Sequence, residues 1–361
     1  MAKKINLHKF FKNKKILITG HTGFKGSWLS VWFLKFGCKV IGISKNIPTK
    51  PSNFINLNLN KKIKNYFVDI KNFKEIKKII VKEKPDIVFH FAAQAIVSES
   101  FDNPIDTVNT NTIGSLNILH TASYLKKKCI CIMITSDKCY FNLEKNSGYK
   151  ENSLLGGKDM YSGSKAAAEI VLNSYFHSFN IKNKNLLFCT ARAGNVIGGG
   201  DWSKNRLIPD IMRAWGKSKK AKIKNSQSIR PWQHVLEPLY GYMKAAYYLN
   251  YKKELNGSSF NFGPSSARSY KVIELIKSLE VLRKHKKQYV IQKKNSFKET
   301  KILKLNSFKA QKKLKWKTSL SIKEMTFYIS DWYNNFFNKK TNMYDFSINQ
   351  IKQYEKKIEK N

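Results

Sequence analysis

Short apolar runs alternate with longer amphipathic stretches along the first half of the chain. The apolar runs lie at residues 15–19, 39–43, 64–68, 87–91, 130–135 and 186–191, and helical patterns separate most of them. Strand-length runs separated by helix-length stretches are typical of parallel strands joined by crossover helices. The pattern therefore predicts an α/β fold built on a doubly wound parallel sheet.

The pattern changes in the second half of the chain. Loops rich in glycine and proline interrupt the helical stretches beyond residue 192, and one more apolar run lies at 258–262. We expect the chain to divide into a sheet domain and a smaller α/β lobe that binds substrate. The sheet domain is expected to comprise 1–191, with 231–262 packing back on it, and the lobe to comprise 192–230 and 263–340.

Composition indicates a globular protein outside membranes. Hydrophobic residues make up 42% of the 361 residues, which is enough for a sizeable core. No apolar run approaches the ~20 residues of a membrane helix, and the lysine-rich start lacks the apolar stretch of a signal peptide. We therefore expect a cytoplasmic protein with no membrane partner. The five cysteines show no Cys-x-x-Cys spacing, so we interpret them as reduced core residues.

The formal net charge of +43 raises the question of a polyanionic partner. Nearly all of the positive charge is lysine, scattered among asparagine and isoleucine in every segment. We therefore expect lysines on solvated faces and no nucleic-acid partner, although the field would help to attract an anionic substrate. Residues 341–361 form a polar, basic tail, which we expect to pack little.

Three glycines follow the first predicted strand, at Gly20, Gly23 and Gly26. Glycine at such a turn lets the backbone approach a pyrophosphate, whose charge then meets the N–H groups at the start of the next helix. Glycines also serve ordinary turns, but their place between the first strand and the first helix favours a dinucleotide site.

Tyr161 and Lys165 lie four residues apart in a helical stretch that continues to about residue 179. This spacing places both side chains on one face of the helix. A nearby ammonium group favours the phenolate and lowers the tyrosine pKa, so that the phenol oxygen can accept a hydroxyl proton. The pair is typical of chemistry that removes a hydride from a carbinol.

Ser136, Asp137 and Lys138 follow the predicted fifth strand, at the end of the sheet where open α/β folds bind ligands. A carboxylic acid kept protonated by burial can protonate a leaving hydroxyl, which makes Asp137 a candidate general acid. A neutral Lys138 is one candidate for the base that removes a carbon-bound proton. Charged residues of a loop that face water are the alternative interpretation.

Together these motifs resemble the extended short-chain dehydrogenase/reductase family, in its branch of NAD-dependent nucleotide-sugar epimerases and dehydratases. The resemblance implies a Rossmann-type sheet, NAD as cofactor, and Ser136 as a hydrogen-bond partner of the reacting oxygen. The second strand ends in Ser44-Lys45 without an acidic residue for the ribose, so NADP stays open. The implied cofactor residues are Gly20, Thr22, Gly23, Phe24, Lys25, Gly26, Asp69, Ile70, Ala92, Ala93, Gln94, Asn111, Tyr161 and Lys165.

The Asp137-Lys138 pair and the segments 192–202 and 229–235 are similar to those of the dehydratases that act on CDP-glucose. This similarity implies CDP-glucose as the substrate and a hydro-lyase reaction that yields CDP-4-keto-6-deoxyglucose for deoxysugar and O-antigen lipopolysaccharide biosynthesis. The steps are oxidation at C4, elimination across C5 and C6, and return of the hydride to C6. The implied substrate residues are Asn195, Arg206, Leu207, Lys224 and Arg230, and no metal is implied.

Other readings remain open at this point. A dehydratase for another nucleotide sugar, or a 4-epimerase, is the nearest alternative enzyme, and Asp137 argues against the epimerase. A non-catalytic sensor is a further alternative, which Ser136, Tyr161 and Lys165 disfavour. The family pairs the helix that follows Tyr161 across a two-fold axis, so the resemblance also implies a homodimer.

Overall fold

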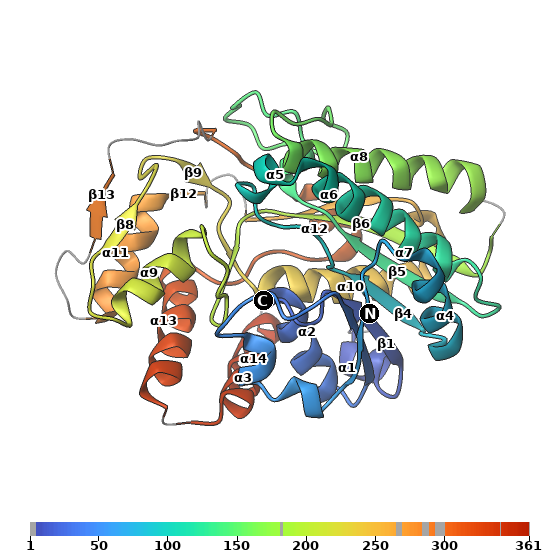
Figure 1. Ribbon diagram of the computed structural model, residues 1–361, viewed down its shortest axis with the longest axis horizontal. Coiled ribbons are helices and arrows are strands. Elements are labelled where there is room, and N and C mark those ends of the chain that lie inside the picture. Colours follow the sequence, from blue (N-terminus) through green and yellow to red (C-terminus); the bar gives the residue numbers. More distant parts are fainter. Residues whose placement is uncertain are drawn as a thin grey trace.

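The computed structural model describes residues 5–180, 183–264, 269–283, 289–292, 300–339 and 341–360. Figure 1 shows a central sheet between layers of helices, with a smaller lobe at one side. The sheet has seven strands in the order β11-β6-β5-β4-β1-β2-β3, and every neighbouring pair is parallel. The strands are β1 (Lys15–Thr19), β2 (Lys39–Ser44), β3 (Lys64–Phe67), β4 (Ile87–His90), β5 (Cys129–Ile134), β6 (Leu186–Ala193) and β11 (Ser259–Phe262). This arrangement confirms the predicted doubly wound parallel sheet.

The central strands are buried on both faces. All six residues of β5 and all eight of β6 are buried. Parallel sheets are covered by helices on each side, so their strands are continuously apolar and do not alternate with polar residues. The five cysteines are free and buried, as expected.

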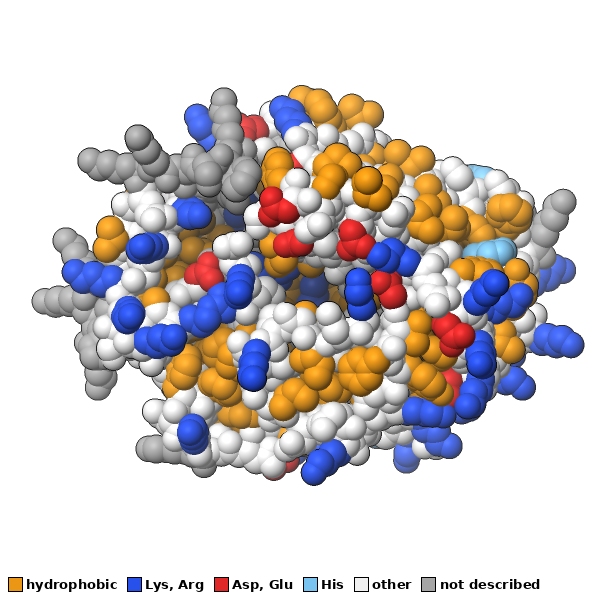
Figure 2. Space-filling view, viewed as in Figure 1, with side chains coloured by type: hydrophobic (Ala, Val, Ile, Leu, Met, Phe, Trp, Pro, Cys, Tyr) orange, Lys and Arg blue, Asp and Glu red, His pale blue; other side chains and the backbone are white. Residues whose placement is uncertain are grey.

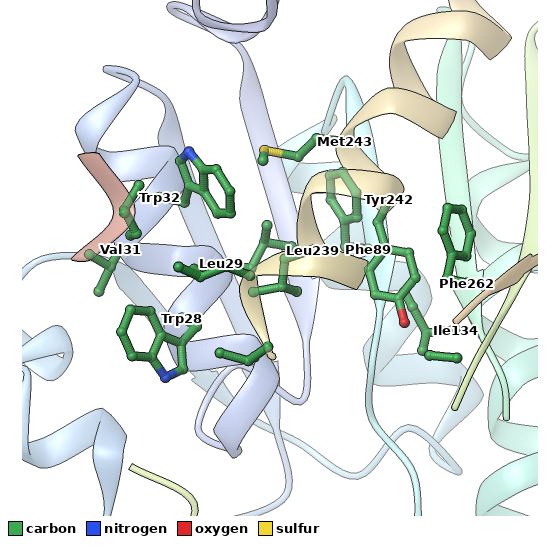
Figure 3. Packing of buried hydrophobic residues seen from close by; sticks show 14 of the residues in the cluster. Trp28, Leu29, Val31, Trp32, Phe89, Ile134, Leu239, Tyr242, Met243 and Phe262 are labelled. Atoms are coloured by element: carbon green, nitrogen blue, oxygen red, sulfur yellow. The ribbon is translucent and has the colours of Figure 1, made fainter. Parts of the chain in front are cut away.

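Two hydrophobic clusters lie on the two sides of the sheet. One combines the sheet with α2 (Phe24–Lys35) and α10 (Leu236–Tyr251), and the other combines it with α4 (Phe73–Glu83), α7 (Gly114–Ala122) and α8 (Met160–Tyr175). Figure 3 shows the first cluster, in which Leu29 of α2 and Leu239 of α10 lie between Trp28 of α2 and Phe89 of β4. Burial of side chains this large stabilises the fold by about 2 kcal/mol each.

The smaller lobe carries short strand pairs between helices. Within the described residues, β8 pairs with β13 in parallel and β9 pairs with β12 antiparallel, while β7 and β10 form a parallel pair. These elements are β7 (Val196–Ile197), α9 (Leu207–Trp215), β8 (Ala221–Ile223), β9 (Ile229–Arg230), β10 (Gln233–His234), β12 (Tyr270–Lys271), α11 (Val272–Arg283), β13 (Tyr289–Ile291) and α13 (Ile322–Asn338). Helix α12 (Phe308–Leu314) follows them in sequence but contacts α10 and β11 of the sheet domain.

Short helices connect the remaining elements. They are α1 (Leu7–Phe11), α3 (Asn53–Asn56), η1 (Leu59–Lys61), α5 (Glu99–Asp102), α6 (Pro104–Val108), η3 (Asp137–Cys139) and η5 (Lys253–Leu255), with π-helical turns η2 (Asn109–Ile113) and η4 (Phe176–Asn180). In the part of the chain that the structure describes, no helix is both long and apolar enough to cross a membrane.

The expectation that residues 341–361 pack little is wrong. They include α14 (Met343–Glu359), which packs against α2 and α13. Met343, Ile351 and Tyr354 are buried, and the Tyr354 hydroxyl donates to Glu237 Oε2 at 2.7 Å. The buried positions of α14 recur with helical spacing and form an apolar face. The many lysines between them make the segment look uniformly polar in the sequence.

Candidate functional site

A cavity of about 1080 Å³ opens at the carboxyl ends of the strands, between the sheet and the smaller lobe. It lies where the strand order reverses between β1 and β4, which is the usual ligand position in such sheets. All but one of the site residues predicted from the sequence line this cavity. The exception is Asn111, which lies behind the wall.

Asn111 supports the loop that follows β4. Its side chain accepts a hydrogen bond from the Gln94 amide at 2.9 Å and donates to the Gln94 carbonyl at 3.0 Å. It also donates to Ser164 Oγ on α8 at 2.9 Å. Asn111 therefore joins the Gln94 loop to the helix that carries Tyr161, and its side chain is fully buried.

The glycine turn between β1 and α2 has the geometry of a phosphate cradle. Gly20 has a φ of +72°, and a Cβ there would lie 2.7 Å from the Ala92 backbone nitrogen. A Cβ on Gly26 would lie 2.3 Å from the Gly20 carbonyl oxygen. The turn places the N-terminus of α2, with its free N–H groups and partial positive charge, in the cavity wall. These residues fit a pyrophosphate.

Asp69 lies after β3 at another part of the cavity wall. Its carboxylate accepts the Lys71 amide at 3.0 Å, and Lys45 and Lys71 lie 3.2 and 3.6 Å from Oδ2. Burial opposes its ionisation, but the Lys71 amide and the two ammonium groups outweigh burial and hold the pKa of Asp69 below its usual value. An ionised carboxylate here fits the hydroxyl or amino groups of an adenosine.

Ser136 and Asp137 stand where β5 ends and η3 begins. The Ser136 hydroxyl donates to Asp137 Oδ1 at 3.1 Å and accepts the Lys138 amide at 3.2 Å. Asp137 Oδ2 is buried and has no hydrogen-bond partner within the described residues. Burial raises the pKa of Asp137, against the opposing charges of Lys138, Arg230 and Lys25 and the hydrogen bond from Ser136. Burial of this kind favours the protonated form of the carboxyl group.

Tyr161 and Lys165 face the same cavity from the first turns of α8. Asp159 caps this helix by accepting the Ser162 amide at 2.9 Å, so the tyrosine lies at a rigid helix start. Burial lowers the pKa of Lys165 to about 8, while the charges of Glu169 and Cys139 raise it.

The expected lowering of the Tyr161 pKa is not found in this structure. Burial is the largest effect and raises the pKa of Tyr161, and the groups that lower it most are the Ser136 hydroxyl and the Arg206 charge. Desolvation of the phenolate therefore dominates, because the side chain is only 8% exposed.

The predicted substrate residues lie on the opposite wall. Asn195 and Leu207 line the cavity, and Lys224 lies exposed at its edge. The Arg206 guanidinium approaches Asp201 Oδ2 at 3.4 Å and donates to the Ala95 carbonyl at 3.2 Å. Arg206 thus reaches from the lobe to the loop after β4.

Arg230 is buried, and its guanidinium donates to the carbonyls of Ile229, Thr300 and Lys301 at 2.9, 2.7 and 3.2 Å. We expected this cation to bind the substrate. It lines the cavity, but it also holds the backbone of Thr300 and Lys301.

Several wall residues were not named as site residues from the sequence, among them Asp201 and Trp232, while Lys45 was noted only because it stands where an acidic residue was expected. Lys45 follows a strand end and Asp201 follows a glycine triplet, which are the signals that marked the other site residues. Among the described residues, no group of three or more histidine, cysteine or acidic side chains is placed to hold a metal ion.

Comparisons with known proteins agree with this geometry. The family model described as GDP-mannose 4,6 dehydratase matches residues 17–327. The chain is 44% identical over 271 residues to the CDP-glucose 4,6-dehydratase of Salmonella typhimurium, which covers 74% of this chain and 75% of that protein. It is 26% identical over 337 residues to the UDP-glucose 4-epimerase of Mycoplasma genitalium, with 90% of this chain and 97% of that protein covered.

Solved structures share the fold. The epimerase Mth375 of Methanothermobacter thermautotrophicus superposes with a TM-score of 0.79 at 21% identity and covers 92% of this chain and 97% of its own. The dTDP-glucose 4,6-dehydratase of Bacillus anthracis, solved in complex with NAD, gives a TM-score of 0.73 at 21% identity and covers 89% and 97%.

Proposed function

The chain belongs to the GDP-mannose 4,6 dehydratase family of extended short-chain dehydrogenases, and we propose that it is a CDP-glucose 4,6-dehydratase that uses NAD. The observation that carries the proposal is Asp137, a buried carboxyl group with a raised pKa that shares one cavity with Ser136, Tyr161 and Lys165. Dehydration needs an acid of this kind, and the 44% identity to the Salmonella typhimurium enzyme supports CDP-glucose as the substrate.

The cavity is large enough for a dinucleotide and a nucleotide sugar together, at about 1080 Å³. The glycine turn and the start of α2 would hold the pyrophosphate of NAD, and Asp69 would hold the adenosine. Bound NAD supplies the hydride acceptor for the first step and the donor for the last. Lys165 would hold the nicotinamide ribose.

Tyr161 acts in the first step as the proton acceptor for the C4 hydroxyl of the sugar. Its raised pKa makes the phenolate a strong base once formed, and the Ser136 hydroxyl favours that phenolate through a hydrogen bond. Ser136 also binds the C4 oxygen as it becomes a carbonyl. The C4–H bond gives up its hydride and the O–H bond gives up its proton, which leaves a ketone.

Asp137 acts in the second step. The C4 ketone acidifies the C5–H bond, and loss of that proton expels the C6 hydroxyl. A protonated Asp137 donates its proton to the departing oxygen, which leaves as water. Lys138 lines the same cavity and is our candidate for the acceptor of the C5 proton. The hydride removed from C4 returns to C6 and a proton returns to C5, so the sugar loses water with no net redox change.

A 4-epimerase is the alternative, because epimerases share the fold and most of the cofactor site. Epimerisation returns the hydride to C4 and needs no acid beside C6. The burial of Asp137 therefore favours the dehydratase.

We also propose a homodimer formed through the outer face of α5, α6 and α8. Four large hydrophobic side chains on these helices are exposed, and Figure 2 shows hydrophobic side chains gathered over them. They are Phe101, Ile105, Met160 and Ile170, which are 50%, 76%, 43% and 53% exposed. Helices that pack on one another and leave such a face open commonly form a two-fold interface.

The test is incubation of the purified protein and NAD with CDP-glucose, dTDP-glucose, UDP-glucose and GDP-mannose, followed by mass spectrometry of the sugars. We expect the product of water loss from CDP-glucose far faster than from the others, with the Tyr161→Phe variant as a blank. Equal turnover of all four would contradict the CDP-glucose assignment. A 4-epimer of unchanged mass would replace the dehydratase with an epimerase.

A further inference from the structure

Glu169 lies one helical turn beyond Lys165 on the same face of α8, further inside the protein. Its carboxylate is only 3% exposed and does not line the cavity. Glu169 Oε1 accepts a hydrogen bond from the Thr135 hydroxyl. Glu169 Oε2 accepts one from the Thr190 hydroxyl and one from Arg192 Nη2, and these two bonds are both 2.8 Å long. A buried carboxylate with this many donors is held in one position.

The donors come from adjacent strands of the sheet. Thr135 follows β5 and directly precedes Ser136, while Thr190 and Arg192 belong to β6. The bond from Thr135 therefore connects α8 to the strand end that carries the proposed acid. A shift of this helix relative to β5 would move Lys165 away from Ser136.

Arg192 neutralises the charge of Glu169, and both of its terminal nitrogens are hydrogen-bonded inside the protein. Besides Glu169, its guanidinium donates to the Tyr140 hydroxyl at 2.8 Å, the Glu151 carbonyl at 2.9 Å and Ser259 Oγ at 3.0 Å. It does not line the cavity. Arg192 opens a segment that resembles a substrate-binding motif in sequence, yet it is part of an internal ion pair.

Glu169 is ionised and is the nearest carboxylate along α8 to Lys165. Burial opposes the ionised form, but Arg192, Thr135 and Thr190 outweigh it and keep the pKa of Glu169 below its usual value. Cys139 on η3, Lys25 on α2 and His90 on β4 also interact electrostatically with Lys165. Lys25 opposes the charge of Lys165 when it is protonated, and Glu169 makes the largest contribution that favours the Lys165 cation, ahead of Cys139.

We propose that Glu169 is a positioning residue for this site, which keeps Lys165 a cation and holds the strand end of Ser136 and Asp137 against α8. The proposal rests on the proposed function for the role of these three residues. It extends the site by a buried pair, Glu169 and Arg192, that touches neither substrate nor cofactor.

The test measures how NADH binding by the full-length Glu169→Gln variant depends on pH. NADH fluorescence reports the binding, and no nucleotide sugar is present. Glutamine keeps the shape and removes the charge. We expect the alkaline loss of NADH binding to occur about one pH unit lower than in the wild type, because the charge of Glu169 raises the pKa of Lys165 and a neighbouring opposite charge typically contributes about that much. Dehydration of CDP-glucose should fall about twofold near pH 7 and about tenfold near pH 9, because lowering the Lys165 pKa from about 8 by one unit changes its protonated fraction by those factors.

Three variants separate positioning from a general structural role. Thr190→Val removes one hydrogen bond to Glu169 but leaves its charge, and should keep the wild-type pH profile. In a Lys165→Met background, the change Glu169→Gln should no longer move the profile, which excludes an effect through Lys25. The double variant Glu169→Gln, Arg192→Met removes both charges, and should fold and show the lower alkaline limb if the single variant does not fold.

A folded Glu169→Gln protein with the wild-type NADH-binding profile would overturn the proposal, as would a Thr190→Val profile that moves equally. If the wild type dehydrates none of the four sugars while the NADH profile still moves, the proposed function fails and the effect of Glu169 on Lys165 stands.

Discussion

Lys45 Nζ lies 3.2 Å from Asp69 Oδ2, which joins the residue after β2 to the residue that follows β3 in the cavity wall. The lysine side chain is 62% exposed, so it can change partners at little cost. Enzymes of this fold that prefer NAD often have a carboxylate at the end of the second strand to bind the ribose hydroxyls. In this chain the Lys45 ammonium occupies that position, and its positive charge favours a 2′-phosphate.

The Lys45→Ala variant should therefore discriminate against the phosphorylated cofactor. We expect its affinity for NADPH to fall about fivefold, since a half-exposed charge contact is worth about 1 kcal/mol. Its affinity for NADH should change by less than about twofold. Fluorescence titration measures both, and Lys39→Ala, at the opposite end of β2, is the matched control. Unchanged NADPH binding would show that Lys45 stays with Asp69.

The Tyr161→Phe variant should lose the first step of the reaction. Without the phenol oxygen the C4 hydroxyl has no proton acceptor, so no NADH absorbance should form when the enzyme is mixed with NAD and CDP-glucose. Loss of a general base typically lowers the rate by about 10²- to 10⁴-fold. Formation of NADH at the wild-type rate would remove Tyr161 from the mechanism.

The Asp137→Asn variant should fail at the second step. Asparagine cannot donate the proton that the C6 hydroxyl needs, while oxidation at C4 remains available. We expect NADH absorbance to accumulate on the enzyme and water loss to slow by about 10²-fold or more. Rapid mixing with absorbance detection shows the first effect and mass spectrometry the second. Near-normal product formation would assign the acid to another group.

Stability should fall as the pH drops below neutral, because three of the histidines that the structure describes are buried. Burial lowers the pKa of His21 to about 4 and the pKa of His90 and His234 to about 3. Their pKa values in the folded protein lie below the unfolded value of 6.5. Their contribution to the free energy of unfolding is therefore fully present above pH 6.5 and is lost as the pH falls towards the folded pKa values.

Between pH 6.5 and about 5.5 each of these histidines should cost about 1 kcal/mol, which makes a loss of about 3 kcal/mol in the free energy of unfolding. Urea unfolding across that interval measures it, and it lies above the range in which carboxylates titrate. A free energy of unfolding that does not change over this interval would show that the histidines are protonated in the folded state.

The proposed dimer should dissociate when charge is placed on the outer face of α6. Ile105 is 76% exposed in the single chain, and Ile105→Glu would bury a carboxylate at the interface without a partner. We expect light scattering to show a dimer for the wild type and a monomer for this variant at micromolar concentration. Val281→Glu is the control, because Val281 of α11 is 79% exposed and lies outside the proposed interface. A monomeric wild type would refute the dimer.

Local sequence patterns determined much of this protein. Strand β1 and the glycine turn were placed from adjacent residues, because a buried strand and a tight turn each depend on local periodicity and on the freedom of glycine. The pairing of Tyr161 with Lys165 likewise follows from helical spacing alone. The position of Ser136 and Asp137 followed from the rule that ligands bind at the carboxyl ends of parallel strands.

The tertiary structure decided how these residues are surrounded. Desolvation reverses the expected lowering of the Tyr161 pKa, and a pattern along the chain cannot report what covers a side chain. Arg192 pairs with Glu169 inside the protein although its segment resembles a binding motif. Tyr354 reaches Glu237 across 117 residues, which makes a helix of a lysine-rich tail part of the core. Contacts between residues far apart in sequence depend on the packing of the whole chain, and these contacts set the charge state and position of each group in the site.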